Sequence, residues 1–240
     1  MDCIQTGTGP IQIVALHGIQ GTRAAWLPLA EALGDVATFT LPNLRGRGTA
    51  VRAAGPGGYS LDAYAADAAE AIEAQVRGPF ILAGWSMGVS VALAYLGLAG
   101  ARKPTGLCLL SGTADLPSAP WFRCTDSVAL LAEVQAREAR LGLKEAADHA
   151  AVVATWQSIR THCQLGRLAT VTEPVLLIHG RDDGDSPWSH ALELSAGLPQ
   201  ASLLGIGGAG HSVLTQNTGQ VVAVLRGFLP ILSSPIKESL

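Results

Sequence analysis

Short apolar runs alternate along this chain with longer segments of helical periodicity. Most of the runs are continuously apolar, which is typical of parallel strands that helices cover on both faces. The alternation therefore predicts an α/β fold, with a mostly parallel central sheet flanked by helices. The candidate strands are Ile11–Leu16, Val36–Leu41, Pro79–Ala83, Gly106–Leu110, Pro174–Ile178 and Ala201–Ile206.

The helical segments lie between these runs. Ser60 is a suitable N-cap for a helix whose apolar positions, from Leu61 to Val76, recur at spacings of three and four. Further helices are expected at Ala24–Leu33, Ser86–Leu98, Trp188–Ala196 and Gln220–Phe228.

The interval from residue 116 to residue 169 contains no convincing strand. It carries two helical patterns, Ser127–Arg140 and Lys144–Arg160, and it is too long for a plain loop. We therefore expect a helical lid or cap at 116–169, inserted into an α/β core formed by residues 1–115 and 170–240. An ordinary crossover made of two helices is the alternative.

Composition excludes several classes of protein. The chain has 240 residues, a charged fraction of 15% and a net charge of −3, without a Lys/Arg cluster that would attract nucleic acid or an anionic membrane. No basic leader with an apolar run opens the sequence, and no stretch approaches the ~18 apolar residues that span a bilayer. The cysteines (Cys3, Cys108, Cys124 and Cys163) lie far apart and lack metal-ligand spacing. We therefore expect a cytoplasmic protein with free thiols and with no metal or cofactor.

The most informative motif is Gly84-Trp85-Ser86-Met87-Gly88, which follows an apolar run and precedes a helical pattern. A serine at such a strand-to-helix turn adopts a strained backbone conformation, and the flanking glycines make room for close packing. We expect Ser86 to be a nucleophile; a purely structural glycine-rich turn is the alternative.

A serine hydroxyl needs a base to remove its proton, and a neutral histidine is the usual one. His211 lies in a glycine-rich loop after the last candidate strand, from which its imidazole can reach the edge of the sheet. His17 is expected to order a loop, and His179 to lie in the core or beside the site. The histidines on helical patterns, His149, His162 and His190, are expected to be solvated.

Three carboxylates are candidates to orient the histidine. Asp182, Asp183 and Asp185 follow the penultimate candidate strand, at the edge where open α/β sheets carry their reactive groups. Spacing alone does not choose among them. The loop Leu16-His17-Gly18-Ile19-Gln20-Gly21 offers a free amide that, with the amide of the residue after the nucleophile, can bind an oxyanion.

The order of nucleophile, acid and histidine resembles that of the α/β-hydrolase superfamily over nearly the whole chain. This resemblance selects Asp183, three residues after Gly180 and four before Pro187, and it implies oxyanion-binding amides at Ile19 and Met87. It also implies a helical lid after the sixth strand of the fold.

Within the superfamily the chain looks most similar to the pimeloyl-carrier-protein methyl ester esterases of biotin synthesis, which share Gly-Trp-Ser at the turn and a lid of comparable length. In those esterases, arginines of the lid are expected to bind the acidic carrier protein. The interval here carries the basic residues Arg123, Arg137, Arg140, Lys144, Arg160 and Arg167. It also carries Asp126, Glu133, Glu138, Glu145 and Asp148, so a solvated face of mixed charge is the alternative.

The resemblance implies a serine carboxylic-ester hydrolase with the triad Ser86, Asp183 and His211. Its expected substrate is a small acyl ester, free or on an acyl-carrier protein, and the chain is expected to be a monomer. Trp85, Trp121, Phe122 and Trp156 could line an acyl pocket, with core packing as the alternative. Hydrolysis of a thioester, lactone or carbon–carbon bond, acyl transfer to an alcohol, and a non-catalytic binding protein remain open.

Overall fold

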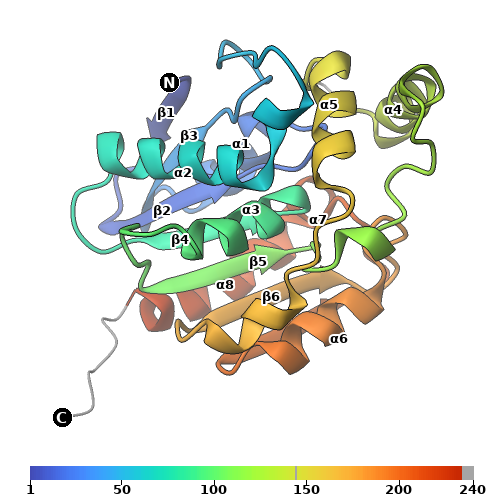
Figure 1. The fold of residues 1–240 in the computed structure, drawn as a ribbon. Helices are drawn as coiled ribbons and strands as arrows, with labels where there is room; N and C mark the ends of the chain where they lie inside the picture. The colour runs from blue at the N-terminus through green and yellow to red at the C-terminus, as the bar shows by residue number, and fades with distance from the viewer. Residues whose placement is uncertain (144, 234–240) are drawn as a thin grey trace.

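A computed structural model describes residues 1–143 and 145–233, and it confirms the predicted α/β class (Figure 1). Seven strands form one sheet in the order β1-β3-β2-β4-β5-β6-β7, in which β1 is antiparallel to β3 and every other pair is parallel. The strands are β1 (Cys3–Thr6), β2 (Ile11–Leu16), β3 (Ala37–Pro42), β4 (Ile81–Trp85), β5 (Gly106–Leu110), β6 (Val175–Gly180) and β7 (Ala201–Ile206).

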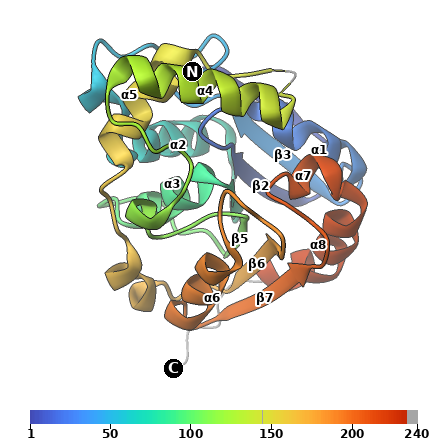
Figure 2. The same ribbon diagram turned by 90° about the vertical axis from the view of Figure 1, so that its right-hand side faces the viewer.

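Helices cover both faces of this sheet (Figure 2). On one face lie α2 (Leu61–Gln75), α3 (Met87–Leu96) and α6 (Trp188–Gly197); on the other lie α1 (Leu27–Ala32), α7 (Val213–Gln216) and α8 (Thr218–Leu232). The remaining helices are α4 (Ser127–Leu141), α5 (His149–Ile159) and the 3₁₀ turns η1 (Arg23–Trp26), η2 (Pro56–Tyr59), η3 (Leu116–Ser118) and η4 (Leu165–Thr170).

The alternation of side chains along each strand divides the apolar core in two. In β2, Val14 and Leu16 pack toward α2 and α3, whereas Ile13 and Ala15 pack toward α1 and α8. Successive side chains of a strand point to opposite faces. A strand buried on both faces, such as β4, β5 or β6, is therefore largely apolar, which is why these strands were recognisable as apolar runs in the sequence.

Two elements differ from the sequence expectations. β1 was not expected, because it is a short edge strand of four residues, two of them polar, in which no residue is fully buried. The helix expected from Lys144 begins instead at His149, after Asp148, and Lys144 itself lies outside the described residues. Ser60 caps α2 as expected, since its Oγ accepts a hydrogen bond from the N–H of Ala63.

The interval between β5 and β6 contains η3, α4, α5 and η4; it is called the insertion below. It follows the fifth strand of this seven-stranded sheet. α4 and α5 lie on the side toward which the parallel strands point, and they pack against each other (Figures 1 and 2). That residues 116–169 form a separate lid stays a prediction. No helix in the described part of the chain is long and apolar enough to cross a membrane.

The turn from β4 to α3 is a tight junction with a strained residue at its centre. Ser86 has φ 57° and ψ −121°, a conformation that an L-residue adopts only at a cost. The glycines on either side allow the approach. A Cβ on Gly84 would lie 2.3 Å from the carbonyl oxygen of Gly88, and a Cβ on Gly88 would lie 2.2 Å from that of Leu16. The strained turn is therefore held by backbone packing that only glycine permits.

We predict that Gly88→Ala lowers the free energy of unfolding by about 2–4 kcal/mol, because its methyl group must displace the backbone of β2. Gly227→Ala is the matched control, since Gly227 lies inside α8 with nothing within 4 Å of its added Cβ. It should gain about 0.5–1 kcal/mol. Urea unfolding at pH 7 measures both. Equal stability of the two variants would contradict the packing argument.

Candidate active site

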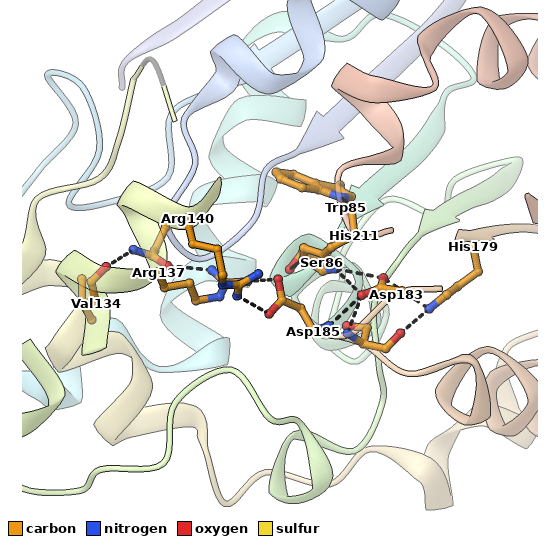
Figure 3. A network of polar contacts seen from close by, with 11 residues as sticks. Trp85, Ser86, Val134, Arg137, Arg140, His179, Asp183, Asp185 and His211 are labelled. Carbon is orange, nitrogen blue, oxygen red and sulfur yellow. Dashed lines mark hydrogen bonds and ion pairs between the residues drawn. The ribbon is translucent and has the colours of Figure 1, made fainter. Parts of the chain in front are cut away.

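Three side chains from different loops meet at the carboxyl edge of the sheet (Figure 3). Ser86 stands between β4 and α3, Asp183 follows β6, and His211 follows β7. The Nε2 of His211 lies 2.9 Å from the Oγ of Ser86, and its Nδ1 lies 3.0 Å from the Oδ2 of Asp183. All three residues are buried. The arrangement is a hydroxyl, an imidazole and a carboxylate in line, as nucleophilic catalysis requires.

The structure separates the three candidate carboxylates. Asp183 faces His211, and its Oδ1 also accepts hydrogen bonds from the backbone N–H groups of Asp185, at 2.9 Å, and Ser186, at 2.8 Å. Asp182 is exposed. Asp185 is buried and pairs with Arg137 and Arg140 of the insertion, so it is neither solvated nor a cap of α6. Backbone hydrogen bonds thus hold the Asp183 carboxylate toward the imidazole.

His179 lies on the far side of Asp183 from His211 (Figure 3). Burial lowers the pKa of His179, so the ring is neutral. Its Nε2 donates a hydrogen bond to the carbonyl of Ser186 at 2.6 Å and lies 3.6 Å from the Oδ2 of Asp183. This buried position agrees with the expectation for His179, and the ring helps to shape the loop that carries Asp183.

Trp85 holds the loop that carries His211. Its indole Nε1 donates a hydrogen bond to the carbonyl of His211 at 3.1 Å, and the two rings pack with their centroids 5.5 Å apart. The same indole lies against Gly18 and Gly21. One buried ring therefore contacts both the histidine loop and the loop after β2.

Two backbone segments approach Ser86 closely. Met87 is the first residue of α3, so its N–H has no acceptor inside the helix and points along the positive end of the helix dipole. Gly18, next to Ile19, packs so closely that an added Cβ would lie 3.1 Å from the Cβ of Ser86. The chain thus brings the loop of Ile19 and the start of α3 to the same hydroxyl.

Buried hydrogen bonds from His17 and Arg47 hold the loop that contains Ile19. The Nδ1 of His17 donates to the carbonyl of Gly18 at 2.9 Å, and its Nε2 accepts from the N–H of Leu44 at 3.1 Å, which requires a neutral ring. The fully buried guanidinium of Arg47 donates to the carbonyl of Ile19. His17 therefore orders this loop, as expected from the sequence.

A small cavity opens beside Ser86. Its walls are Gly18, Ile19, Gln20, Gly21, Trp85, Ser86, Arg137, Leu141, Leu143 and His211. The space open to a water-sized molecule is about 10 Å³, roughly what a single water needs. Leu141 and Leu143 of the insertion are among the side chains that limit this space.

Four aromatic residues were expected in an acyl pocket. Trp85 lines this cavity, whereas Trp121, Phe122 and Trp156 do not. Trp121 and Phe122 pack on Trp156, each with its ring centroid 5.6 Å from that of Trp156. All three belong to the apolar core between the insertion and the sheet. They are packed as core residues, and a role in an acyl pocket stays a prediction.

The sequence did not predict the contacts by which Gln20, Arg137 and Asp185 connect the site to the insertion. Gln20 bonds to Val134 and Arg137 of α4, and Arg137 reaches Asp185. Nothing in the local sequence indicates these contacts, because each residue is a polar residue in a loop or on a helix. Their partners lie at least 48 positions away along the chain.

The remaining histidines include one wrong expectation. His190 is buried in α6 rather than solvated, and its Nε2 lies 3.1 Å from the Oγ of Ser118 in η3. His149 is half-buried and bonds to Glu138, and His162 is exposed. The four cysteines are free thiols.

With this geometry established, the comparison with known proteins identifies the family. Residues 13–224 match the family model described as "Alpha/beta hydrolase family". The match covers most of the chain, so this protein belongs to the alpha/beta hydrolase family.

Individual relatives are distant. The chain is 28% identical to the pimeloyl-[acyl-carrier protein] methyl ester esterase of Nitrosomonas europaea, over 86% of this chain and 90% of that protein. It is 25% identical to the AB hydrolase superfamily protein YisY of Bacillus subtilis, over 71% and 74%. Among solved structures, an esterase from Exiguobacterium antarcticum superposes with a TM-score of 0.81 at 19% identity, over 95% of this chain and 94% of that one. The last similarity shows a shared fold.

We predict that His17 makes stability depend on pH. Burial, followed by the charge of Arg47, lowers the pKa of His17 from 6.5 to about 3. Between these values the folded chain binds fewer protons than the unfolded chain, so the contribution is complete above pH 6.5 and is lost as the pH falls. From pH 7.5 to pH 5, His17→Gln should lose about 2 kcal/mol less unfolding free energy than the wild type.

Urea unfolding at the two pH values measures this difference. His162→Gln, which removes an exposed imidazole, is the control for loss of a histidine. Parallel losses in the wild type and His17→Gln would show that His17 is not buried as a neutral ring.

Proposed function

We propose that this protein is a serine carboxylic-ester hydrolase in which Ser86 is the nucleophile, His211 the general base and Asp183 the orienting acid. The observation that carries the proposal is the continuous pair of contacts from Ser86 through His211 to Asp183. Membership of the alpha/beta hydrolase family supports it.

The geometry suggests the order of steps. His211 accepts the hydroxyl proton at Nε2 while the Oγ of Ser86 forms a bond to the ester carbonyl carbon. His211 then donates that proton to the leaving alcohol as the carbon–oxygen bond breaks, which leaves an acyl-serine. Water, deprotonated by His211, attacks this acyl group, and the proton returns to Ser86 as the acid departs.

The N–H groups of Ile19 and Met87 are proposed to donate to the oxygen that becomes negative in each tetrahedral intermediate. The positive end of α3 adds to this stabilisation. Asp183 keeps the Nδ1–H of His211 directed toward itself, so that Nε2 faces Ser86, and it balances the imidazolium that forms. Backbone amides and ionisable side chains supply all these roles, so the proposed reaction needs no cofactor.

We predict that Ser86→Ala lowers kcat/KM for a short p-nitrophenyl ester by about 10⁴-fold or more, because the nucleophile is lost while the fold remains. A fluorophosphonate should label wild-type Ser86 at one site per chain and should not label the variant. Ser127→Ala is the control, since Ser127 lies in the insertion at the first residue of α4. Residual hydrolysis by Ser86→Ala near the wild-type rate would refute the proposal, and a chain without any acyl turnover would favour a binding protein.

A methyl ester carried on an acyl-carrier protein is a second candidate substrate. The relative that is 28% identical is named a pimeloyl-[acyl-carrier protein] methyl ester esterase, and the alignment covers most of both proteins, which favours this candidate. The basic side chains open to such a partner include Arg123 and Arg167, which are exposed. Arg137 is not available, because it is buried and already paired with Asp185.

We predict that the wild type prefers short acyl chains and that Leu141→Ala shifts the preference toward longer ones, because Leu141 is a wall of the small cavity beside Ser86. Losing the leucine side chain opens space for two to three methylene groups, so kcat/KM for a hexanoate ester should rise about 10-fold relative to acetate. Leu131→Ala is the control, since Leu131 is also on α4 but faces a groove toward α5. Unchanged preferences would place the acyl chain elsewhere.

A wider panel of substrates, analysed by the mass of the products, distinguishes ester hydrolysis from the other possible reactions. It includes a thioester, a lactone, an added alcohol acceptor, and a dicarboxylate monomethyl ester both free and on acyl-carrier protein. A preference for the carrier-bound ester would support the second candidate; faster reaction of a thioester or lactone would replace the carboxylic ester.

A further inference from the structure

Arg137 has an unusual position for a residue of the insertion. It lies on α4, its side chain is only 6% exposed, and it forms part of the wall of the cavity beside Ser86. Its guanidinium packs over the ring of Phe122, 5.6 Å from the centroid. An arginine is rarely this buried unless its donors have specific acceptors.

One arm of the guanidinium binds the loop that carries Ile19. Its Nη1 donates to the Oε1 of Gln20 at 2.6 Å. Gln20 also donates from Nε2 to the carbonyl of Val134 at 2.8 Å, and its own carbonyl accepts from the N–H of Ala147 at 2.9 Å. The residue next to the proposed oxyanion amide is therefore held by three contacts from the insertion.

The other arm binds the loop that carries Asp183. The Nη2 of Arg137 donates to the Oδ2 of Asp185 at 3.1 Å, and the N–H of Asp185 donates to the Oδ1 of Asp183 at 2.9 Å. Burial alone would raise the pKa of Asp185, but the charges of Arg137 and His211 and the contact with Arg140 together outweigh burial and hold that pKa below its usual range. Asp185 is therefore a carboxylate, and the ion pair is buried on both sides.

A planar guanidinium suits this position because its donors diverge in a rigid fork. Gln20 and Asp185 belong to loops that follow β2 and β6, which are not neighbours in the sheet. In Figure 3, Arg137 approaches Asp185 from the side opposite His179. The fork thus bridges two loops that the sheet itself does not join.

We propose that Arg137 is a positioning residue that couples the closed insertion to both halves of the active site, the oxyanion loop through Gln20 and the triad carboxylate through Asp185. The inference rests on the proposed function. With the insertion in place, Arg137 sets the spacing between the Ile19 amide and the Asp183 carboxylate on either side of Ser86. When α4 moves away, both loops lose a buried contact.

The test compares arginine variants on the same helix. Arg137→Gln should lower kcat for a short ester about 100-fold with little change in KM, the size of effect that a misplacement of about 1 Å produces. Arg137→Lys should recover less than a tenth of this loss, because a single ammonium cannot serve both acceptors. Arg140→Gln is the matched control: Arg140 pairs with the other oxygen of Asp185, but its side chain is 59% exposed. It should stay within about twofold of the wild type.

Single-arm variants distinguish coupling from a general loss of packing. Gln20→Ala and Asp185→Asn should each lower kcat about 10-fold, and Arg137→Gln should add less than about twofold once both are present, because one acceptor of Arg137 is then removed and the other has lost its charge. The melting temperature of each variant is recorded as a measure of folding. If Arg137→Gln does not fold, Gln20→Ala, Asp185→Asn and Arg137→Lys still provide the test.

Two results would overturn the inference: a wild-type kcat in Arg137→Gln, or an equal loss in Arg140→Gln, which would reduce the effect to charge near Asp185. The rate at which a fluorophosphonate labels Ser86 is measured alongside. Slow labelling of Arg137→Gln supports the inference without any ester. Wild-type protein whose Ser86 does not react at all would instead contradict the proposed function.

Discussion

At the junction between β4 and α3, two backbone carbonyl groups occupy the space that a side chain at Gly84 or Gly88 would need. Gly88 packs on the carbonyl of Leu16, and Gly84 packs on that of Gly88, so β2, β4 and α3 approach to backbone contact around Ser86. This contact maintains the positive φ of Ser86 and directs its hydroxyl out of the sheet edge. It also brings the end of β2, and with it Gly18 and Ile19, to the same hydroxyl. The strain at Ser86 and the position of the loop that contains Ile19 therefore share one cause.

Much of the fold was predictable because both faces of the sheet are buried. In β4, β5 and β6, neighbours on both sides demand apolar residues at every position, which leaves a readable run in the sequence. β1 pairs on one side only and lies partly in solvent, so its four residues carry no such signal. His190 was misjudged for a related reason. A lone polar residue on a helix does not reveal that η3, more than seventy residues earlier in the chain, covers it.

The candidate site divides in the same way. Ser86 and His211 were predictable because local glycine patterns at strand ends mark them, and the strand order brings those ends together. Asp183 needed the spacing known from a family, since Asp182 and Asp185 stand on the same loop. The roles of Gln20, Arg137 and Asp185 depend on side-chain contacts between the sheet and the insertion. Such contacts leave no local pattern, because an arginine on a helix looks the same whether it faces water or a buried carboxylate.

The distribution of charge around the site follows from what burial costs. A guanidinium can be removed from water only where several oxygens receive its donors, and both buried arginines near the site meet this condition. Arg47 donates to the hydroxyl of Tyr64 and to the carbonyl of Ile19, and Arg137 donates to Gln20 and Asp185. Arg47 thus binds this segment at Ile19, and Arg137, which belongs to the insertion, binds it at Gln20. A loop between two buried cations has little freedom to shift its amides. Rigid donors stabilise a developing negative charge without reorganising, which is the property that the proposed acyl chemistry needs of this loop.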